Sequence, residues 1–306
     1  MIHAESLTRR FGDRVAVERL TFDVEAGEIV GLLGPNGAGK TTTIRMLAGM
    51  IAPSSGSARI GGYDPAESPE RVHEIVGLLT EAPGFYDRLT AAENLAYFAR
   101  FYGGLDVADA VDRSLERMGL ADRRRDRVGT FSRGMKHRLA LARALVHAPR
   151  VLLLDEPTAG LDPEAAHDLR ALIVQLSGEG RTILLCTHNL AEAESLCRRI
   201  AVLRTKLVAL ATPDSLRGQR FGATIRIRLE RDATPLVRAV GDLPFVESVH
   251  AELEGGRRLV VRLAEPDRNR PGLVSRIVEL GGEIHEVVED RKTLEDVYLE
   301  LMKEEG

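Results

Sequence analysis

The stretch GPNGAGKTT, residues 34–42, decides the fold of this chain. It follows the apolar run IVGLL, residues 29–33, and precedes a helix-like segment from Thr42 to Leu47. In that strand–loop–helix setting the pattern GxxxxGKS/T predicts a nucleotide phosphate site. Its glycines permit a tight loop whose backbone N–H groups cradle phosphate oxygens, and the N-terminus of the following helix adds positive potential.

Two side chains of this loop carry the chemistry. We expect Lys40 to contact the β- and γ-phosphates and the Thr41 hydroxyl to take one position on Mg²⁺. The other residues of the predicted phosphate site are Gly34, Pro35, Asn36, Gly37, Ala38, Gly39 and Thr42. A glycine turn that merely precedes a lysine is the alternative, and the strand and helix on either side disfavour it.

A second candidate site follows the apolar run VLLL, residues 151–154, which is typical of a strand buried on both faces. Asp155 stands at the end of that strand, where a carboxylate can hold Mg²⁺ directly or through water. Glu156 comes next and is placed to orient and polarise the attacking water. Together with Lys40 and Thr41, these residues supply the groups that phosphoryl transfer needs.

A third motif is FSRGMKHRLALARAL, residues 131–145. Ser132 is a good N-cap, and apolar residues recur after it at helical spacing. Ser132 and Gly134 therefore lie at the N-terminus of an amphipathic helix, which favours anions.

In this order the motifs resemble those of the nucleotide-binding subunit of an ATP-binding-cassette (ABC) transporter. The phosphate loop resembles Walker A, VLLLDE resembles Walker B, and FSRGM stands at the place of the LSGGQ-like signature. The resemblance covers about the first 215 residues and implies ATP as ligand, with Mg²⁺. It also implies roles for Asp162 in the D-loop, for His188 as the switch histidine and for Phe11 as the aromatic that stacks on adenine.

Two departures from the family pattern matter. The signature has Arg133 in place of a glycine and Met135 in place of a glutamine, a variant that resembles export-type members. Glu81 stands in the loop LLTEAPGFY where the family usually has glutamine. A carboxylate there can still reach Mg²⁺ or its water, and a plain surface acid is the alternative.

Composition excludes several classes of protein. The net charge is −4, which implies no global attraction to nucleic acid or anionic membrane, and two cysteines do not make a disulfide framework. The N-terminal residues lack an apolar signal core, and no window approaches the roughly 20 apolar residues of a membrane helix. We expect a cytoplasmic protein, held on the inner face of the cell membrane by a separate permease that forms the pathway.

The basic run RRRDR, residues 123–127, is the one segment that suggests nucleic-acid binding. No aromatic residues are interleaved for base stacking, and acidic residues interrupt the run. A solvated face is the better interpretation, and no nucleic-acid partner is expected.

The pattern changes near Gly218, so we expect an α/β nucleotide-binding domain over 1–218 and a small α+β accessory domain over 219–306. By its resemblance to the family, the first is expected to have the P-loop NTPase fold with an N-terminal antiparallel β subdomain and a helical subdomain at about 88–150. In the second, residues 224–230 alternate strictly as in a half-buried strand of an antiparallel sheet. Further strands are expected at 259–263 and 283–288, with helices from Pro271 to Leu280 and after a Thr293 cap. This ending resembles the accessory domain of many drug-, lipid- or ion-export ATPases.

A chain with one cassette holds Walker A, Walker B and one signature, and in the family the signature of one subunit closes on the ATP of the other. The sequence therefore predicts a C₂ homodimer around two ATP molecules that drives a permease. One alternative is a soluble ABC ATPase acting on ribosomes or DNA, although such members usually carry two cassettes or long coiled-coil insertions. A non-hydrolysing regulator is a further alternative, which Glu156 disfavours.

Overall fold

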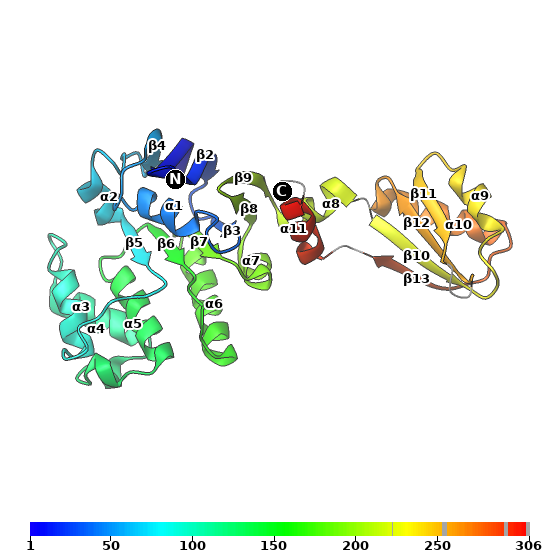
Figure 1. Ribbon diagram of the computed structural model, residues 1–306. Helices are drawn as coiled ribbons and strands as arrows, with labels where there is room; N and C mark the ends of the chain where they lie inside the picture. Colours follow the sequence, from blue (N-terminus) through cyan, green and yellow to red (C-terminus); the bar gives the residue numbers. More distant parts are fainter. Residues whose placement is uncertain (222, 253–255, 291–292, 304–306) are drawn as a thin grey trace. The chain divides into compact units, whose positions relative to one another are not determined.

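The computed structural model describes residues 1–221, 223–252, 256–290 and 293–303 (Figure 1). The chain divides into two compact units, Met1–Thr212 and Pro213–Gly306. The expected boundary at Gly218 lies within one continuous helix, α8 (Pro213–Phe221), so the division falls before that helix begins. The expected end of the second domain, Gly306, lies outside the described residues.

A six-stranded sheet forms the centre of the first unit, in the order β5-β6-β7-β3-β8-β9. All pairs are parallel except β8 with β9, which confirms the predicted parallel sheet. These strands are β3 (Ile29–Leu33), β5 (Val76–Leu79), β6 (Val151–Asp155), β7 (Thr182–Thr187), β8 (Arg199–Arg204) and β9 (Lys206–Ala211). Every residue of β3, β6 and β7 is buried, as their continuous apolar runs predict.

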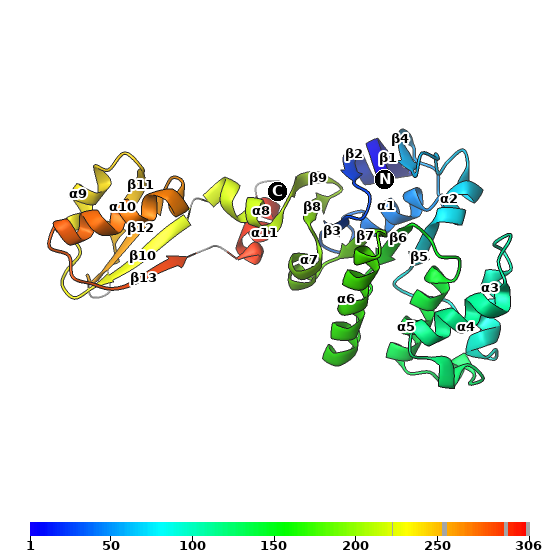
Figure 2. The same ribbon diagram turned by 180° about the vertical axis from the view of Figure 1, so that it is seen from behind.

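A second, three-stranded antiparallel sheet of this unit has the order β2-β1-β4. Its strands are β1 (Ile2–Phe11), β2 (Arg14–Val24) and β4 (Ser55–Ile60). The phosphate-loop helix α1 (Lys40–Leu47) packs between the two sheets, because it contacts β6 and β7 on one side and β2 and β4 on the other (Figures 1 and 2). One apolar cluster joins both sheets through this helix.

The helical subdomain holds α3 (Ala91–Ala99), α4 (Val107–Arg117) and α5 (Arg133–Leu145). Thr90 begins α3 with a capping box, and the Ser132 Oγ accepts a hydrogen bond from the Met135 N–H at the start of α5. The Ser132 cap was expected from the sequence. The basic run before α5 is exposed and pairs locally, with Arg123 on Asp126 and Arg124 on Asp112, which agrees with a solvated face. The remaining helices of this unit are α2 (Pro69–Ile75), α6 (Pro163–Gly178) and α7 (Leu190–Leu196).

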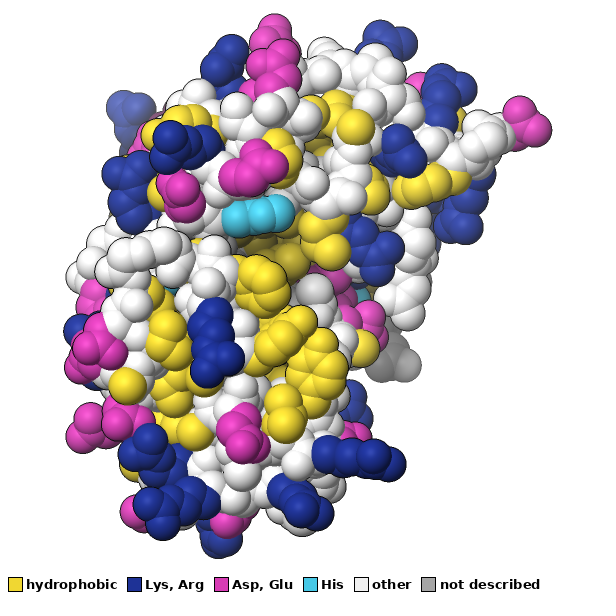
Figure 3. Space-filling model, turned by 90° about the vertical axis from the view of Figure 1, so that its left-hand side faces the viewer, with side chains coloured by type: hydrophobic (Ala, Val, Ile, Leu, Met, Phe, Trp, Pro, Cys, Tyr) yellow, Lys and Arg dark blue, Asp and Glu magenta, His cyan; other side chains and the backbone are white. Residues whose placement is uncertain are grey.

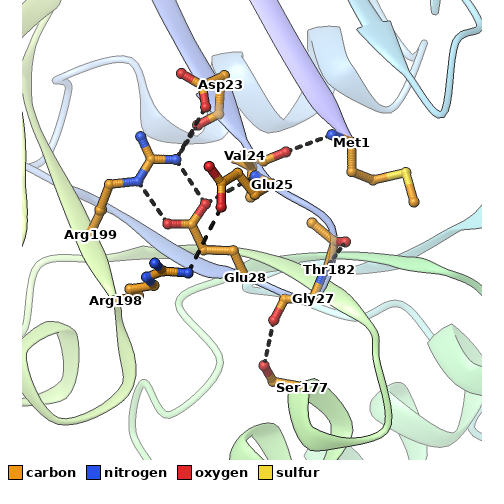
Figure 4. A network of polar contacts seen from close by, with 10 residues as sticks. All are labelled: Met1, Asp23, Val24, Glu25, Gly27, Glu28, Ser177, Thr182, Arg198 and Arg199. Atoms are coloured by element: carbon orange, nitrogen blue, oxygen red, sulfur yellow. Dashed lines mark hydrogen bonds and ion pairs between the residues drawn. The ribbon is translucent and has the colours of Figure 1, made fainter.

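A buried ion pair fixes the turn that leads into β3 (Figure 4). Glu28 is only 4% exposed, and its two oxygens accept hydrogen bonds from Nε and Nη2 of Arg199 at 2.7 and 2.8 Å. Arg199 also contacts Asp23 on β2. The contact therefore ties the antiparallel sheet and β3 to the first residue of β8.

The second unit contains a four-stranded antiparallel sheet in the order β11-β12-β10-β13. Its elements are β10 (Ala223–Leu229), α9 (Leu236–Gly241), β11 (Val246–Ala251), β12 (Arg258–Leu263), α10 (Pro266–Glu279) and β13 (Ile284–Asp290). This β-α-β-β-α-β order is that of a split βαβ fold. The alternating residues Ile225, Ile227 and Leu229 are buried, as predicted for β10. The last helix, α11 (Leu294–Lys303), packs against α8.

Two expectations for the second unit need correction. α10 begins at Pro266, five residues before the expected start at Pro271. A proline can stand inside a helix at some cost, so it marks a helix start less reliably than we assumed. The short elements α9 and β11 were not predicted, because six residues carry too little periodicity.

Candidate nucleotide-binding and hydrolysis site

The order of the central strands brings three distant segments together. β6, β7 and β3 are neighbours and parallel, so their carboxyl ends lie at one edge of the sheet. The phosphate loop follows β3, Asp155 and Glu156 lie at the end of β6, and His188 follows β7. Ligands of open α/β sheets bind at this edge.

The glycines of the phosphate loop are required by its geometry. Gly37 and Gly39 have φ angles of 85° and 99°. A Cβ atom on Gly39 would lie 2.5 Å from the carbonyl oxygen of Ala16, and one on Gly34 would lie 2.4 Å from that of Leu203. Gly39 is the N-cap of α1 and offers no side-chain cap, so the first-turn N–H groups of the helix can serve an anion.

The phosphate loop from Pro35 to Thr42 lines a cleft of about 370 Å³. Its lining includes most of the predicted site: Phe11, Pro35, Asn36, Gly37, Ala38, Gly39, Lys40, Thr41, Thr42, Glu81, Glu156 and His188. Gly34 is buried beside the loop, where its carbonyl oxygen accepts a 2.6 Å hydrogen bond from Lys40 Nζ. The predicted phosphate and catalytic residues therefore share one cleft.

Phe11 stands at this cleft with 47% of its surface exposed. The Arg9 guanidinium lies 4.6 Å from the ring centroid. An exposed aromatic ring beside a phosphate loop can stack on a nucleotide base.

Glu156 links two of the predicted catalytic side chains. Its Oε1 lies 3.3 Å from Lys40 Nζ, and its Oε2 lies 2.9 Å from His188 Nδ1. Lys40 and Glu156 are buried, whereas most of the His188 side chain is exposed. The carboxylate thus faces the end of the phosphate loop, between the residue that would hold a phosphate and the histidine.

Asp155 lies deeper than Glu156 and is 2% exposed. Burial raises the pKa of its carboxyl group, and the nearby carboxylates of Glu156 and Glu81 add to this rise. A hydrogen bond with the Thr41 hydroxyl and the charge of Lys40 act in the opposite direction. The Oδ1 atom of Asp155 is buried without a hydrogen-bond partner. An unpaired carboxylate oxygen next to a threonine hydroxyl fits a divalent cation.

The donor set also indicates which kind of cation fits. Within the described part of the chain, no three His, Cys, Asp or Glu side chains group in a way that would enclose a metal. Mg²⁺ is usually held by one or two carboxylates together with substrate phosphates, which matches Asp155 and Thr41 beside a phosphate loop.

Gly34 and Asp155 are buried and do not line the cleft, and three further predicted residues stand at the N-termini of α5 and α6, outside it. Ser132 caps α5, and Gly134 lines a different cavity, between α5 and α6. Asp162 is the N-cap of α6, where its Oδ1 accepts a hydrogen bond from the Ala165 N–H at 2.9 Å. Within one chain the signature therefore does not contribute to the cleft of the phosphate loop.

The cleft also contains Ala159 of the D-loop motif and two residues that the sequence interpretation missed, Arg14 and Ala16. Arg14 pairs with Phe11 across the β1–β2 hairpin, which brings a positive charge beside the phosphate loop. Arg14 could have been predicted as a site residue, because it is a basic residue three positions after Phe11, the expected adenine-stacking aromatic.

Comparisons with known proteins agree with this geometry. The ABC transporter family matches residues 17–159. A bacitracin transport ATP-binding protein of Bacillus licheniformis is 36% identical over 305 residues, which cover 99% of this chain and 97% of that protein. A fluoroquinolone export ATP-binding protein of Mycobacterium tuberculosis is 41% identical over 242 residues, which cover 78% of this chain and 80% of that protein. The solved structure of an ATP binding subunit of an ABC transporter matches with a TM-score of 0.66 and 33% identity, over 72% of this chain and 92% of the other.

The two relatives are transport proteins, so the comparisons favour a transporter subunit over a soluble ATPase acting on ribosomes or DNA. Over the described residues, the structure contains no helix with the length and apolar character needed to span a membrane. With Lys40, Glu156 and His188 gathered at one phosphate loop, the chain belongs to the ABC transporter family, as an ATP-binding and ATP-hydrolysing subunit.

Proposed function

We propose that two copies of this chain close around two ATP molecules and thereby drive a separate integral-membrane permease. The observation that carries this proposal is the separation of the signature from the cleft. Ser132 and Gly134 stand at the N-terminus of α5, outside the cleft that contains Lys40, Glu156 and His188. A C₂ pair supplies each cleft with the signature of the other copy, and the same contact is made twice.

Within each composite site the residues divide the work. Lys40 and the loop N–H groups hold the phosphates, and Phe11 stacks on the base. Glu156 orients the attacking water while His188 holds the carboxylate from its other side. The helix N-terminus at Ser132 and Gly134 of the second copy adds positive potential at the γ-phosphate.

Mg²⁺ is proposed as the cofactor of this site. Asp155 and Thr41 would hold the cation with the phosphate oxygens, and Glu81 would reach it directly or through water. When bound, the cation neutralises the charge that develops on the transferred phosphoryl group. The unpaired Oδ1 of Asp155 supports this assignment.

An exposed aromatic surface on the helical subdomain is the proposed permease contact. Tyr97 packs edge-on against Tyr86 and Phe101 at centroid distances of 5.1 and 5.5 Å, and all three rings are exposed. Figure 3 views this side of the molecule and shows hydrophobic side chains gathered there. Exposed apolar clusters of this kind mark interaction sites, and an apolar helix end of the permease is the occupant that a transporter subunit requires.

One loop connects this aromatic surface to the nucleotide cleft. Glu81 lines the cleft and Tyr86 lies five residues later on the surface. Buried Asn94 on α3 bonds both the N–H and the C=O of Tyr86. A change at the cleft can therefore reach the permease contact through this loop.

The direction and cargo of transport are proposed from the relatives. Several of them are named for the export of antibiotics or of Nod factor, or for antibiotic resistance. We propose export of a drug, lipid or ion, with the chain on the cytoplasmic face of the membrane through its permease.

The aromatic surface is tested by Phe101→Glu, which should abolish recovery of the chain in native membranes while leaving its ATP turnover in solution unchanged. Undiminished membrane recovery would exclude this surface as the contact.

The phosphate site is tested by Lys40→Ala, with Arg45→Ala as the matched control. Arg45 is an exposed basic residue on the same helix, α1, and does not line the cleft. Lys40→Ala should reduce ATP turnover of the purified chain by at least about 100-fold, because phosphate charge is then uncompensated. Arg45→Ala should turn over ATP as the wild type does. Wild-type turnover in Lys40→Ala would contradict the assignment.

A further inference from the structure

Arg133, the residue that replaces a glycine of the family signature, contacts the D-loop of its own chain. The D-loop is the segment AGLD, residues 159–162. Arg133 is the first residue of α5, and its Nη2 donates a hydrogen bond to the carbonyl oxygen of Ala159 at 3.1 Å. Ala159 itself lines the nucleotide cleft.

The Arg133 guanidinium packs against Gly160 of the D-loop, at a position where a side chain would clash with it. Gly160 has a φ of 67°, and a Cβ atom added to it would lie 2.1 Å from Cζ of Arg133 and 2.2 Å from each of its terminal nitrogens. Any side chain at position 160 would thus displace Arg133 as well as strain the backbone. The guanidinium fills the space that the glycine leaves.

The same D-loop turn is joined to the backbone of the catalytic residue Glu156. The Ala159 N–H donates to the carbonyl oxygen of Glu156 at 3.1 Å, and the Leu161 N–H donates to that of Thr158 at 3.2 Å. Arg133 in turn lies between Ser132 and Gly134, the two signature residues. One contact therefore connects the signature of a chain to the segment that follows its own Glu156.

We propose that Arg133 is a positioning residue that makes the signature and the D-loop of one chain move together. This inference rests on the proposed function, in which the signature serves the ATP of the partner copy while Glu156 serves its own. In the dimer, the signature of a chain belongs to one composite site and its D-loop to the other. The Arg133 contact within each chain therefore connects the two composite sites. Arg133 acts through the D-loop backbone, by its hydrogen bond to the carbonyl oxygen of Ala159.

The first test measures amide hydrogen exchange of residues 158–162 without nucleotide. Arg133→Ala keeps the helix, since alanine is a good helix former. It should accelerate exchange at Ala159 and Leu161 by about three- to tenfold, the range expected for the loss of one supporting contact. The control is Lys136→Ala, on the same helical turn, whose ion pair goes to Asp87 at 3.1 Å and not to the D-loop.

The second test is a double-mutant cycle on ATP turnover with Arg133→Ala, Gly160→Ala and the double variant. Gly160→Ala should be far more harmful in the wild-type chain than in the Arg133→Ala background, because the clash with the guanidinium is absent from the double variant. We expect a coupling of about three- to tenfold between the two positions. ATP affinity of each variant, measured by calorimetry, should stay unchanged because the phosphate loop is untouched.

The outcomes separate this inference from the proposed function. Unchanged exchange in Arg133→Ala, equal acceleration in Lys136→Ala, or additive turnover effects would each overturn the inference while leaving the composite site intact. A wild-type chain that neither hydrolyses ATP nor dimerises with it would overturn the proposed function. In that case the exchange result alone would still decide whether Arg133 holds the D-loop.

Discussion

Glu156 occupies a backbone position that side chains other than glycine rarely adopt, with a φ of 51° at the end of β6. Such strain costs on the order of 1–3 kcal/mol and persists where the surroundings determine it. Here the Glu156 N–H donates to the carbonyl oxygen of Cys186, and the carboxylate contacts Lys40 and His188. At the scale of single residues, the strained turn aims this carboxylate at the phosphate loop.

Glu156→Gln should separate binding from hydrolysis. The amide has nearly the same shape but lacks the negative charge that polarises water, so turnover should fall at least about 100-fold. ATP affinity by calorimetry should stay near that of the wild type, since the phosphate loop keeps its geometry. Glu164→Gln, an exposed acid in the first turn of α6, is the control and should behave as the wild type. Normal hydrolysis by Glu156→Gln would remove Glu156 from the mechanism.

At the scale of elements, the site depends on how β6, β7 and β3 are ordered. The buried apolar strands, the phosphate loop and the caps of α3 and α5 could be predicted, because local sequence determines them. Lys40 and Glu156 were assigned to one reaction from the residues themselves, whereas His188 was anticipated only through the family resemblance, since strand order is not readable from one sequence. The contact of Arg133 with the D-loop was not predicted, because it joins residues 26 positions apart.

The Glu28–Arg199 pair should stabilise the junction of the sheets. Burial acts to raise the pKa of Glu28, but hydrogen bonds from Arg199 and from the Glu25 N–H outweigh it, so the pKa is lowered. Glu28→Gln should reduce the free energy of unfolding at pH 7 by about 2–3 kcal/mol, because a buried charged hydrogen bond is lost. The measurement is urea unfolding, with Glu25→Gln as an exposed control that should change stability by under about 0.5 kcal/mol.

The lowered pKa of Glu28 determines how the difference in unfolding free energy between wild type and Glu28→Gln depends on pH. A lowered pKa in the folded state contributes stability that is fully present above the ordinary glutamate pKa of about 4.3. It is lost as the pH falls through the lower pKa of the folded state. The gap between wild type and Glu28→Gln should therefore narrow below about pH 4. A gap that stays constant from pH 7 to pH 3 would contradict the ion-pair explanation.

At the scale of the whole molecule, the two units have separate apolar cores. Unit Met1–Thr212 holds every residue of the nucleotide cleft and the signature helix. The second unit has its own apolar cluster beneath its sheet. All the residues that line the nucleotide cleft therefore belong to the first unit.

A chain ending at Thr212 should fold and bind ATP with an affinity close to that of the full chain. The reason is that the core of the first unit and its cleft lie within residues 1–212. Circular dichroism checks the fold, and calorimetry gives the affinity. Loss of ATP binding by a folded truncated chain would show that the second unit completes the site.

The composite site is tested most directly by a chain that carries both Asn36→Cys and Ser132→Cys. In the proposed dimer, Cys at position 36 of one copy forms a disulfide with Cys at position 132 of the other. Asn36 is an exposed residue of the phosphate loop, Ser132 begins the signature helix, and the native Cys186 and Cys197 are buried. Adding ATP in the Glu156→Gln background should produce a disulfide-linked dimer on a non-reducing gel, and each single-cysteine chain should stay monomeric. A double-cysteine chain that binds ATP by calorimetry but forms no more crosslinked dimer with ATP than without it would contradict the shared site.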